Sequence, residues 1–161
     1  MSRGEATPDA VTAALDRELG TIGTQSVLLS QAVADRLGLH PTDVEVLDLL
    51  GRGGPRTAGQ LGAVTGLTSG AVTRLIDRLE RAGYVRRAPH PRDRRSVLIA
   101  PVPERLARDV APLYSALEQA LTGLRADYTG EQLALMGDFL GRVNAAVRDH
   151  IARLRLARSD G

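Results

Sequence analysis

Apolar residues recur every three or four positions over most of the chain, which is the spacing of one face of an α-helix. The first such stretch covers about residues 8–37 and follows a Thr7-Pro8 pair that is typical of a helix start. The last stretch, residues 133–154, keeps this spacing most regularly. Both patterns predict long amphipathic helices at the two ends of the chain.

Capping boxes divide the centre of the chain into short helices. Thr42 with Glu45, and Thr57 with Gln60, have the spacing at which two residues satisfy each other's backbone N–H groups at a helix start. Apolar residues and then glycine follow each pair, and glycine ends a helix readily. The sequence therefore predicts two short helices that begin near residues 42 and 57.

A third short helix is predicted between Thr68, a capping residue, and Gly83, a typical stop. One face is apolar and carries Val72, Leu75, Ile76 and Leu79. The opposite face is polar and cationic and carries Ser69, Gly70, Thr73, Arg74, Asp77, Arg78 and Arg81. Residues 84–88 and 96–100 then read as strands, joined by the exposed loop PHPRDRR, so we expect a β-hairpin with an arginine-rich tip.

Helical periodicity returns after the hairpin. It begins at Pro103 and continues to Tyr128, and Pro112 inside this stretch is expected to kink the helix. Thr129 with Gln132 is a further capping box, ahead of the last helix. The fold class is therefore mainly α with a small β-hairpin wing: a winged helix-turn-helix flanked by long helices.

Positive charge is concentrated in the centre of the chain. Residues 52–95 hold ten arginines and three acids, a net charge of +7, whereas the rest of the 161 residues carry −5. All 21 basic residues are arginines, whose planar guanidinium suits two-point contact with phosphate or guanine. This asymmetry favours a polyanionic partner for the centre, although a solvated charged face is an alternative.

Composition argues against several other classes of protein. Cysteine is absent and aromatic residues make up 2%, which excludes thiol chemistry and disfavours base stacking on single strands. We expect a cytoplasmic protein, because no apolar run reaches the roughly 20 residues of a membrane span and the start lacks a signal-peptide core. His40, His90 and His150 are isolated and no catalytic motif occurs, so we expect no metal, no cofactor and no enzymatic activity.

The order of two helices, a turn, a basic-fronted helix and a hairpin suggests how duplex DNA is bound. A helix can enter the major groove and read base edges. An arginine-tipped hairpin can reach a neighbouring minor groove, where narrow A·T-rich segments concentrate negative potential. The alternative is a winged-helix module that binds an acidic protein partner.

Residues 57–99 resemble the MarR family of bacterial winged helix-turn-helix transcription regulators. The closest matches are AVTRLIDRLERAGYVRR, residues 71–87, and the Asp93-x-Arg95 motif of the wing. The resemblance implies a homodimer, formed by an N-terminal helix (1–40) and C-terminal helices (101–161), around a DNA-binding core (41–100). It also implies binding to a pseudo-palindromic site, repression as the usual outcome, and release by a small-molecule effector in many members.

The resemblance also implies which residues meet DNA. The helix that starts at Thr68 would be the recognition helix, and Arg95 would enter the minor groove with Asp93 orienting it. The expected DNA-contacting residues are Thr57, Thr68, Ser69, Gly70, Thr73, Arg74, Arg78, Arg92, Asp93, Arg94 and Arg95. After the wing the sequence departs from the family pattern, since prolines 101 and 103 replace a threonine cap and a glycine, and this leaves the angle of the wing open.

Overall fold

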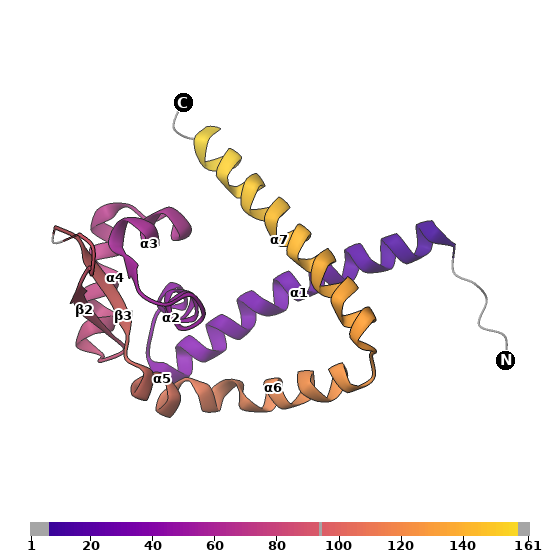
Figure 1. The fold of residues 1–161 in the computed structure, drawn as a ribbon, viewed down its shortest axis with the longest axis horizontal. Helices are drawn as coiled ribbons and strands as arrows, with labels where there is room; N and C mark the ends of the chain where they lie inside the picture. The colour runs from indigo at the N-terminus through magenta and orange to yellow at the C-terminus, as the bar shows by residue number, and fades with distance from the viewer. Residues whose placement is uncertain (1–6, 94, 158–161) are drawn as a thin grey trace. The chain divides into compact units, whose positions relative to one another are not determined.

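The structure is a computed structural model that describes residues 7–93 and 95–157. Its elements, labelled in Figure 1, are α1 (Pro8–Leu37), α2 (Pro41–Gly53), β1 (Arg56–Thr57), α3 (Ala58–Thr65), α4 (Ser69–Arg81), β2 (Val85–Pro89), β3 (Val97–Pro101), α5 (Pro103–Asp109), α6 (Ala111–Ala126) and α7 (Gly130–Ala157). The expected class, mainly helical with a small β-hairpin wing, is confirmed. The chain forms two compact units, residues 1–110 and 111–161. The division into dimerisation and DNA-binding segments remains a functional prediction.

The helix α1 has the predicted ends. The Thr7 side chain accepts a hydrogen bond from the Ala10 N–H at its start, and Gly38 closes it with a φ of 65°. Only the last turns of α1 pack closely against the rest of the first unit, because Val33 and Ala34 are the buried residues of this helix. The remaining apolar residues of this helix are left largely open in the single chain.

The helix α2 begins differently from the prediction. The capping box is formed by His40 and Asp43 and not by Thr42 and Glu45. The Thr42 N–H donates to His40 Nδ1 (3.2 Å), and the His40 N–H donates to Asp43 Oδ2 (3.1 Å). Pro41 occupies the first helical position, where a missing N–H costs little, and this places Thr42 inside the first turn.

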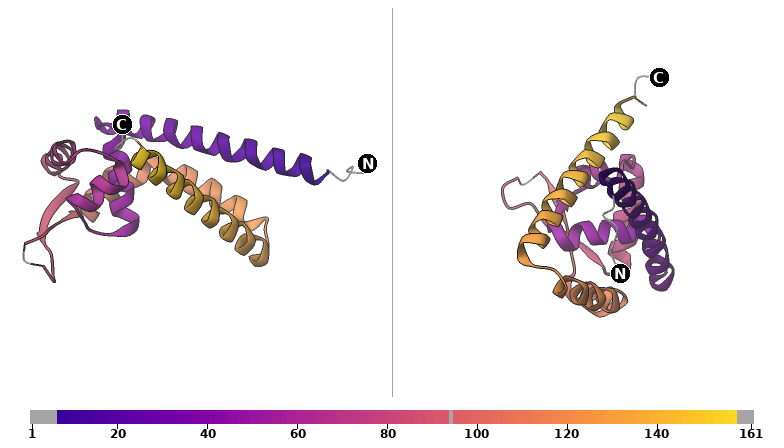
Figure 2. Two further views of the ribbon diagram at one scale, coloured as in Figure 1. Left: turned by 90° about the horizontal axis from the view of Figure 1, so that it is seen from above. Right: turned by 90° about the vertical axis from the view of Figure 1, so that its right-hand side faces the viewer.

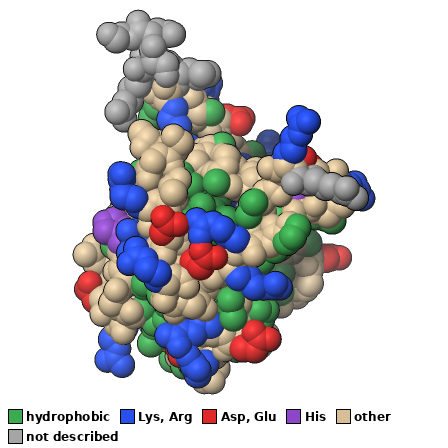
Figure 3. All heavy atoms as spheres, turned by 90° about the vertical axis from the view of Figure 1, so that its left-hand side faces the viewer, with side chains coloured by type: hydrophobic (Ala, Val, Ile, Leu, Met, Phe, Trp, Pro, Cys, Tyr) green, Lys and Arg blue, Asp and Glu red, His purple; other side chains and the backbone are tan. Residues whose placement is uncertain are grey.

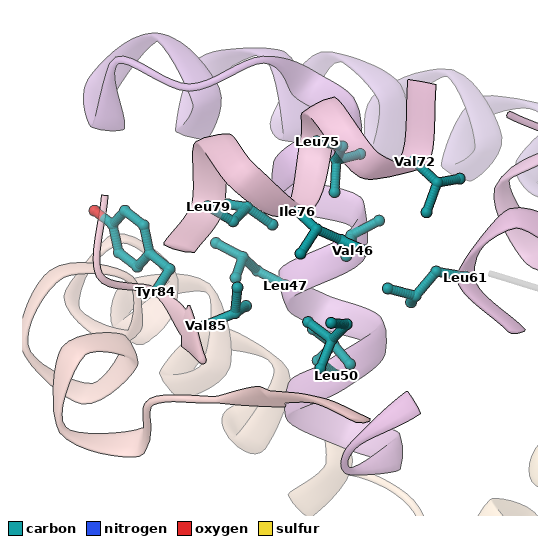
Figure 4. Close-up of a cluster of buried hydrophobic side chains, with 11 residues drawn as sticks. Val46, Leu47, Leu50, Leu61, Val72, Leu75, Ile76, Leu79, Tyr84 and Val85 are labelled. Atoms are coloured by element: carbon teal, nitrogen blue, oxygen red, sulfur yellow. The ribbon is translucent and has the colours of Figure 1, made fainter. Parts of the chain in front are cut away.

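The predicted stripe of α4 forms the centre of the core in the first unit. Figure 4 shows these side chains pointing toward those of α2 and toward Leu61 of α3. Val72, Leu75, Ile76 and Leu79 are each at most 3% exposed. The predicted caps of α3 and α4 are also confirmed, with the Gln60 N–H donating to Thr57 and the Ala71 N–H donating to Thr68.

Among the residues that the structure describes, the sheet has three strands in the order β1-β3-β2. Gly83, with a φ of 77°, turns the chain out of α4, and the Tyr84 N–H closes this turn by donating to the Leu79 carbonyl (3.0 Å). The hairpin is antiparallel, with Val85 opposite Pro101 and Pro89 opposite Val97. The left view of Figure 2 shows the hairpin extending away from the helices of its unit. The sequence did not predict β1, because a strand of two residues has no readable periodicity.

The segment after the hairpin breaks where a kink was predicted. α5 ends at Asp109 and α6 begins at Ala111. Pro112 has no N–H to donate to the carbonyl four residues earlier, and its ring crowds that carbonyl, so the helix does not continue through this point. The double-proline junction is tight, because the Val102 N–H donates to the Tyr84 carbonyl (2.9 Å) and Pro103 starts α5 directly.

The second unit consists of α6 and α7. The predicted capping box between Thr129 and Gln132 is confirmed at the start of α7. Five residues of the predicted apolar stripe are 40–55% exposed in the single chain: Met136, Leu140, Val147, Ile151 and Leu154. Within the described residues, none of the helices is long and apolar enough to cross a membrane.

Candidate nucleic-acid interface

The first two turns of α4 present small and polar residues to solvent. Ser69, Gly70, Thr73 and Arg74 are all exposed, whereas the stripe on the opposite side is buried. A helix with one fully buried face can present only the other to a ligand, so burial of the stripe fixes which residues of α4 can approach DNA. These four are residues that the sequence placed at the interface.

The side chain of Arg74 lies back over the first turn of α4. A Cβ atom built at Gly70 would be 3.7 Å from Arg74 Nη1. The guanidinium therefore lies near the N-terminal end of the helix, beside a position that has no side chain of its own. This arrangement leaves the backbone at Gly70 open to close approach and puts the five N–H donors of Arg74 next to it.

Thr57 and Thr68 are both N-cap residues. Each hydroxyl oxygen accepts a backbone N–H bond within its helix, from Gln60 and Ala71 respectively. Each hydroxyl hydrogen remains a donor, because a hydroxyl group can accept and donate at the same time. Capping is thus compatible with the predicted contact to phosphate.

Arg78 has a partner inside the protein that the sequence did not reveal. Its Nε donates to Asp43 Oδ2 and its Nη2 donates to Asp43 Oδ1, both at 2.6 Å. Asp43 is fully buried, while the Arg78 side chain is 42% exposed. The hydrogen bond and charge of Asp43 raise the pKa of Arg78, although burial acts against this. Arg78 therefore holds α4 against the start of α2, and its contact with DNA remains a prediction.

The tip of the wing is braced by Asp93. Its carboxylate accepts hydrogen bonds from the Arg95 backbone N–H (3.0 Å) and from the Ser96 hydroxyl (2.5 Å). The Ser96 bond, followed by the Arg95 bond, lowers the pKa of Asp93. Asp93 thus holds the backbone of Arg95, and Ser96 is a member of this turn that sequence reasoning missed. Arg92 and Arg95 are exposed, and Arg94 lies outside the described residues.

Two candidate reading elements therefore belong to the same compact unit, the exposed face of α4 and the hairpin tip. Figure 3, which looks onto the side where these elements lie, shows arginine side chains spread over the surface with acidic side chains between them. In the part of the chain that the structure describes, no three His, Cys, Asp or Glu side chains lie close enough to hold a metal ion. The fold and this face define a winged helix-turn-helix DNA-binding protein.

Comparisons with known proteins agree with this class of protein and identify the family within it. The family model described as MarR family matches residues 37–96. The helix-turn-helix transcriptional regulator YcgE of Bacillus subtilis is 42% identical over 134 residues, which are 83% of this chain and 86% of that protein. The chain therefore belongs to the MarR family, and it is a DNA-binding transcription regulator.

Solved structures show the same fold. A MarR family protein from Bacillus stearothermophilus matches with a TM-score of 0.62 at 22% identity, over 88% of this chain and 99% of that one. Wild-type MarR from E. coli matches with a TM-score of 0.55 at 25% identity, over 80% of this chain and 95% of that one. These relatives give no support to the alternative expectation of an acidic protein partner.

The pair of Asp43 and Arg78 predicts a large loss of stability when one partner is removed. Arg78→Met leaves a fully buried carboxylate without its cation, and we expect the free energy of unfolding to fall by about 3 kcal/mol. This value is at the low end for a buried pair because Arg78 is partly exposed. Chemical denaturation monitored by circular dichroism measures the change.

Arg74→Met is the matched control for this experiment, because it removes the same charge from an exposed position of the same helix, where we expect a change within about 0.5 kcal/mol. Adding Asp43→Asn to Arg78→Met should restore part of the loss, because the buried charge is then gone. Equal effects of the two arginine variants would contradict the structural role of Arg78.

The lowered pKa of Asp93 predicts that the wing tip loosens in acid. Since the carboxylate is bound in the folded state, its contribution is present above the pKa of the unfolded chain and is lost as the pH falls through the lower, folded pKa. The Arg95 amide resonance, followed by NMR from pH 7 downward, should titrate with a midpoint below 3.8, the ordinary value.

Ser96→Ala tests the cause of this shift. It removes the largest contribution to the lowered pKa, so the midpoint of Asp93 should rise toward the ordinary value while the turn still forms at neutral pH. A midpoint at or above the ordinary value in the unmodified protein would show that Asp93 does not brace the tip.

Proposed function

We propose that this transcription regulator is a homodimeric repressor that reads a pseudo-palindromic duplex, with α4 in the major groove and the wing in the minor groove. The observation that carries the proposal is the exposed face of α4, where Ser69, Gly70, Thr73 and Arg74 lie opposite a fully buried stripe. Small and polar side chains at the start of a helix suit contact with base edges.

The recognition helix divides its work between bases and phosphates. Arg74 is the base reader, because its fork can bind O6 and N7 of guanine together. Gly70 lets the backbone of the first turn come close to the DNA. Thr57 and Thr68 donate their hydroxyl hydrogens to phosphates, where the N-terminal dipoles of α3 and α4 also favour negative charge.

The wing supplies contacts that depend on the shape and charge of the DNA. Arg95 enters the minor groove, where A·T pairs look alike but the groove width and potential vary with sequence. Arg92 and Arg94 contact the flanking phosphates. Asp93 contributes indirectly, by holding the backbone from which Arg95 extends.

A second copy of the chain covers the exposed apolar residues of α1, α6 and α7. These helices leave large side chains open in the single chain, among them Ile22 of α1 (59%) and Leu124 of α6 (57%). A two-fold dimer duplicates each reading element, and a site recognised by such a dimer is itself nearly palindromic.

We place the protein in the cytoplasm, where a dimer bound at a promoter would repress transcription. A small-molecule effector is proposed to reverse this repression. Such an effector would act by binding more tightly to dimers whose two reading helices do not match the groove spacing. The activity is therefore one of regulated binding, without a catalytic step.

Mutation of the two reading elements should give different losses of affinity. Arg74→Ala is expected to cost about 1–3 kcal/mol per contact on the preferred site and to relax base preference at one position of each half-site. Arg95→Ala should weaken binding to many sequences and lower the salt dependence by about one charge per subunit. Titrations use a site selected from random duplexes, its single-base variants and random duplex, at several salt concentrations.

Gly70→Ala is the control for the placement of α4. The added methyl group meets only Arg74 Nη1 at 3.7 Å, so it fits the free protein and should leave its stability unchanged or higher. Affinity for DNA should fall, because the methyl group occupies the space needed for close approach.

If Arg74→Ala weakened all duplexes equally while Arg95→Ala changed base preference, the proposed groove assignments would be reversed.

Dimerisation predicts the solution mass of the protein. The interface formed by α1, α6 and α7 should exceed roughly 2,000 Å², as in obligate dimers, because a large apolar surface must be covered. Light scattering at micromolar concentration should give twice the 17.1 kDa of one chain. A stable, folded species with the mass of a single chain would refute the homodimer.

A further inference from the structure

A three-residue cluster ties the outer strand of the wing to α4. Arg87 of β2 donates from Nη2 to Asp77 Oδ1 (2.6 Å) and from Nη1 to Glu80 Oε2. The backbone N–H of Arg87 also donates to Glu80 Oε1 (3.2 Å). We call Arg87, Asp77 and Glu80 the α4–β2 clamp. None of its ion pairs is local in sequence, since each joins the helix to the strand across the turn at Gly83.

Stability alone does not account for this clamp. Its side chains are 37–46% exposed, and exposed ion pairs contribute about 0–1 kcal/mol to stability. The geometry is more specific than that of a single pair, because Asp77 and Glu80, which are about one helical turn apart, hold one guanidinium from two sides. A planar fork held at two points resists rotation of the strand that carries it.

The place of β2 in the sheet gives this contact its consequence. β2 lies at an edge of the sheet, and within the described part of the chain it pairs with β3 alone, in the order β1-β3-β2. Arg87 lies opposite Ile99 in the middle of the hairpin, and the chain reaches the wing tip a few residues later. A rotation of β2 about the Gly83 turn would therefore carry the tip, and Arg95 with it, away from its place relative to α4.

We propose that Arg87 is a positioning residue for DNA recognition: the clamp sets the direction of the wing relative to α4, so that Arg74 and Arg95 bind the same duplex together. This inference rests on the roles proposed above for α4 and the wing. The clamp also places one positive charge between two acids of α4, which reduces the repulsion between these acids and the phosphates of bound DNA. By setting the direction of the wing, Arg87 increases the preference for a matching site without touching the DNA.

Direct contact between Arg87 and a phosphate is the competing role, and the two roles predict opposite results when the acids are neutralised. With Asp77→Asn and Glu80→Gln, a positioning clamp is broken, so preference for the selected site over random duplex should fall about tenfold. Affinity for random duplex should rise in the same variant, since two negative charges are gone. If Arg87 were a phosphate ligand, the same variant would strengthen binding to both duplexes and keep the preference.

Arg87→Met should lower the preference for the selected site by a similar factor, and the exchanged pair Arg87→Glu with Glu80→Arg should recover part of it. Arg86→Met is the matched control, because it removes the same charge from the next position of β2 and leaves the clamp intact. We expect Arg86→Met to leave the preference unchanged. Equal losses from Arg86→Met and Arg87→Met would overturn the proposal, because they would assign the effect to charge.

A double-mutant cycle connects the clamp to the wing. If the clamp acts by placing Arg95, the loss of affinity for the selected site caused by Arg87→Met should be at least about threefold smaller in an Arg95→Ala background than in the unmodified protein. Additive losses would overturn the proposal. Melting temperatures of all variants should stay close to that of the unmodified protein, and a variant that melts early is replaced by the exchanged pair.

The same experiments separate this inference from the function on which it rests. If Arg74→Ala and Arg95→Ala leave binding unchanged, the two reading elements are wrongly assigned and the clamp has nothing to position. If these variants behave as proposed while the clamp variants keep full preference for the selected site, only the clamp is refuted.

Discussion

Burial of one apolar stripe on α4 is the constraint on which the rest of the first compact unit depends. Val72, Leu75, Ile76 and Leu79 are almost completely removed from solvent, and each large aliphatic side chain buried in this way contributes about 1.5–3 kcal/mol. Turning the helix about its axis would expose these residues and bury charged ones. The stripe therefore determines which face of α4 is exposed to solvent and open to a ligand, before any polar contact is made.

Two arginines then fix what the stripe leaves free. A helix packed by an apolar stripe can still slide along its own axis, and Arg78 prevents this by a two-point contact with the buried carboxylate of Asp43. Asp43 also accepts the His40 N–H, so the start of α2 and the middle of α4 share one anchoring group. Arg87 makes the corresponding link from α4 to the hairpin. Apolar packing thus fixes the rotation of α4 about its axis. The ion pair of Arg78 fixes the position of α4 along that axis, and the ion pairs of Arg87 link α4 to the wing.

The sequence predicted the parts of this arrangement that depend on local patterns. The cap at Thr68, the stripe of α4 and the stop at Gly83 could be read because each is set by residues within a few positions of one another. The pairing of Asp43 with Arg78 could not be read, because it joins residues 35 positions apart and depends on how two helices cross. The capping box of α2 was missed for a different reason, since histidine is an unusual N-cap and the Thr42 and Glu45 pair fitted the usual pattern.

These contacts also change the meaning of the net charge. Residues 52–95 hold only three acids, and in the structure each is bound to groups of the protein itself: Asp77 and Glu80 to Arg87, and Asp93 to Ser96 and the Arg95 backbone. Carboxylates held in this way point their oxygens at protein donors and repel a neighbouring phosphate less than free ones would. The pairing of Arg87 is already counted in the total of +7, because Asp77 and Glu80 are two of these three acids. Asp43 lies outside residues 52–95 and pairs with Arg78, so the positive charge that this region presents is smaller than the total suggests. In the proposed mode of binding, the arginines that contact DNA are exposed ones such as Arg74 and Arg95, while Arg78 and Arg87 hold the elements that carry them.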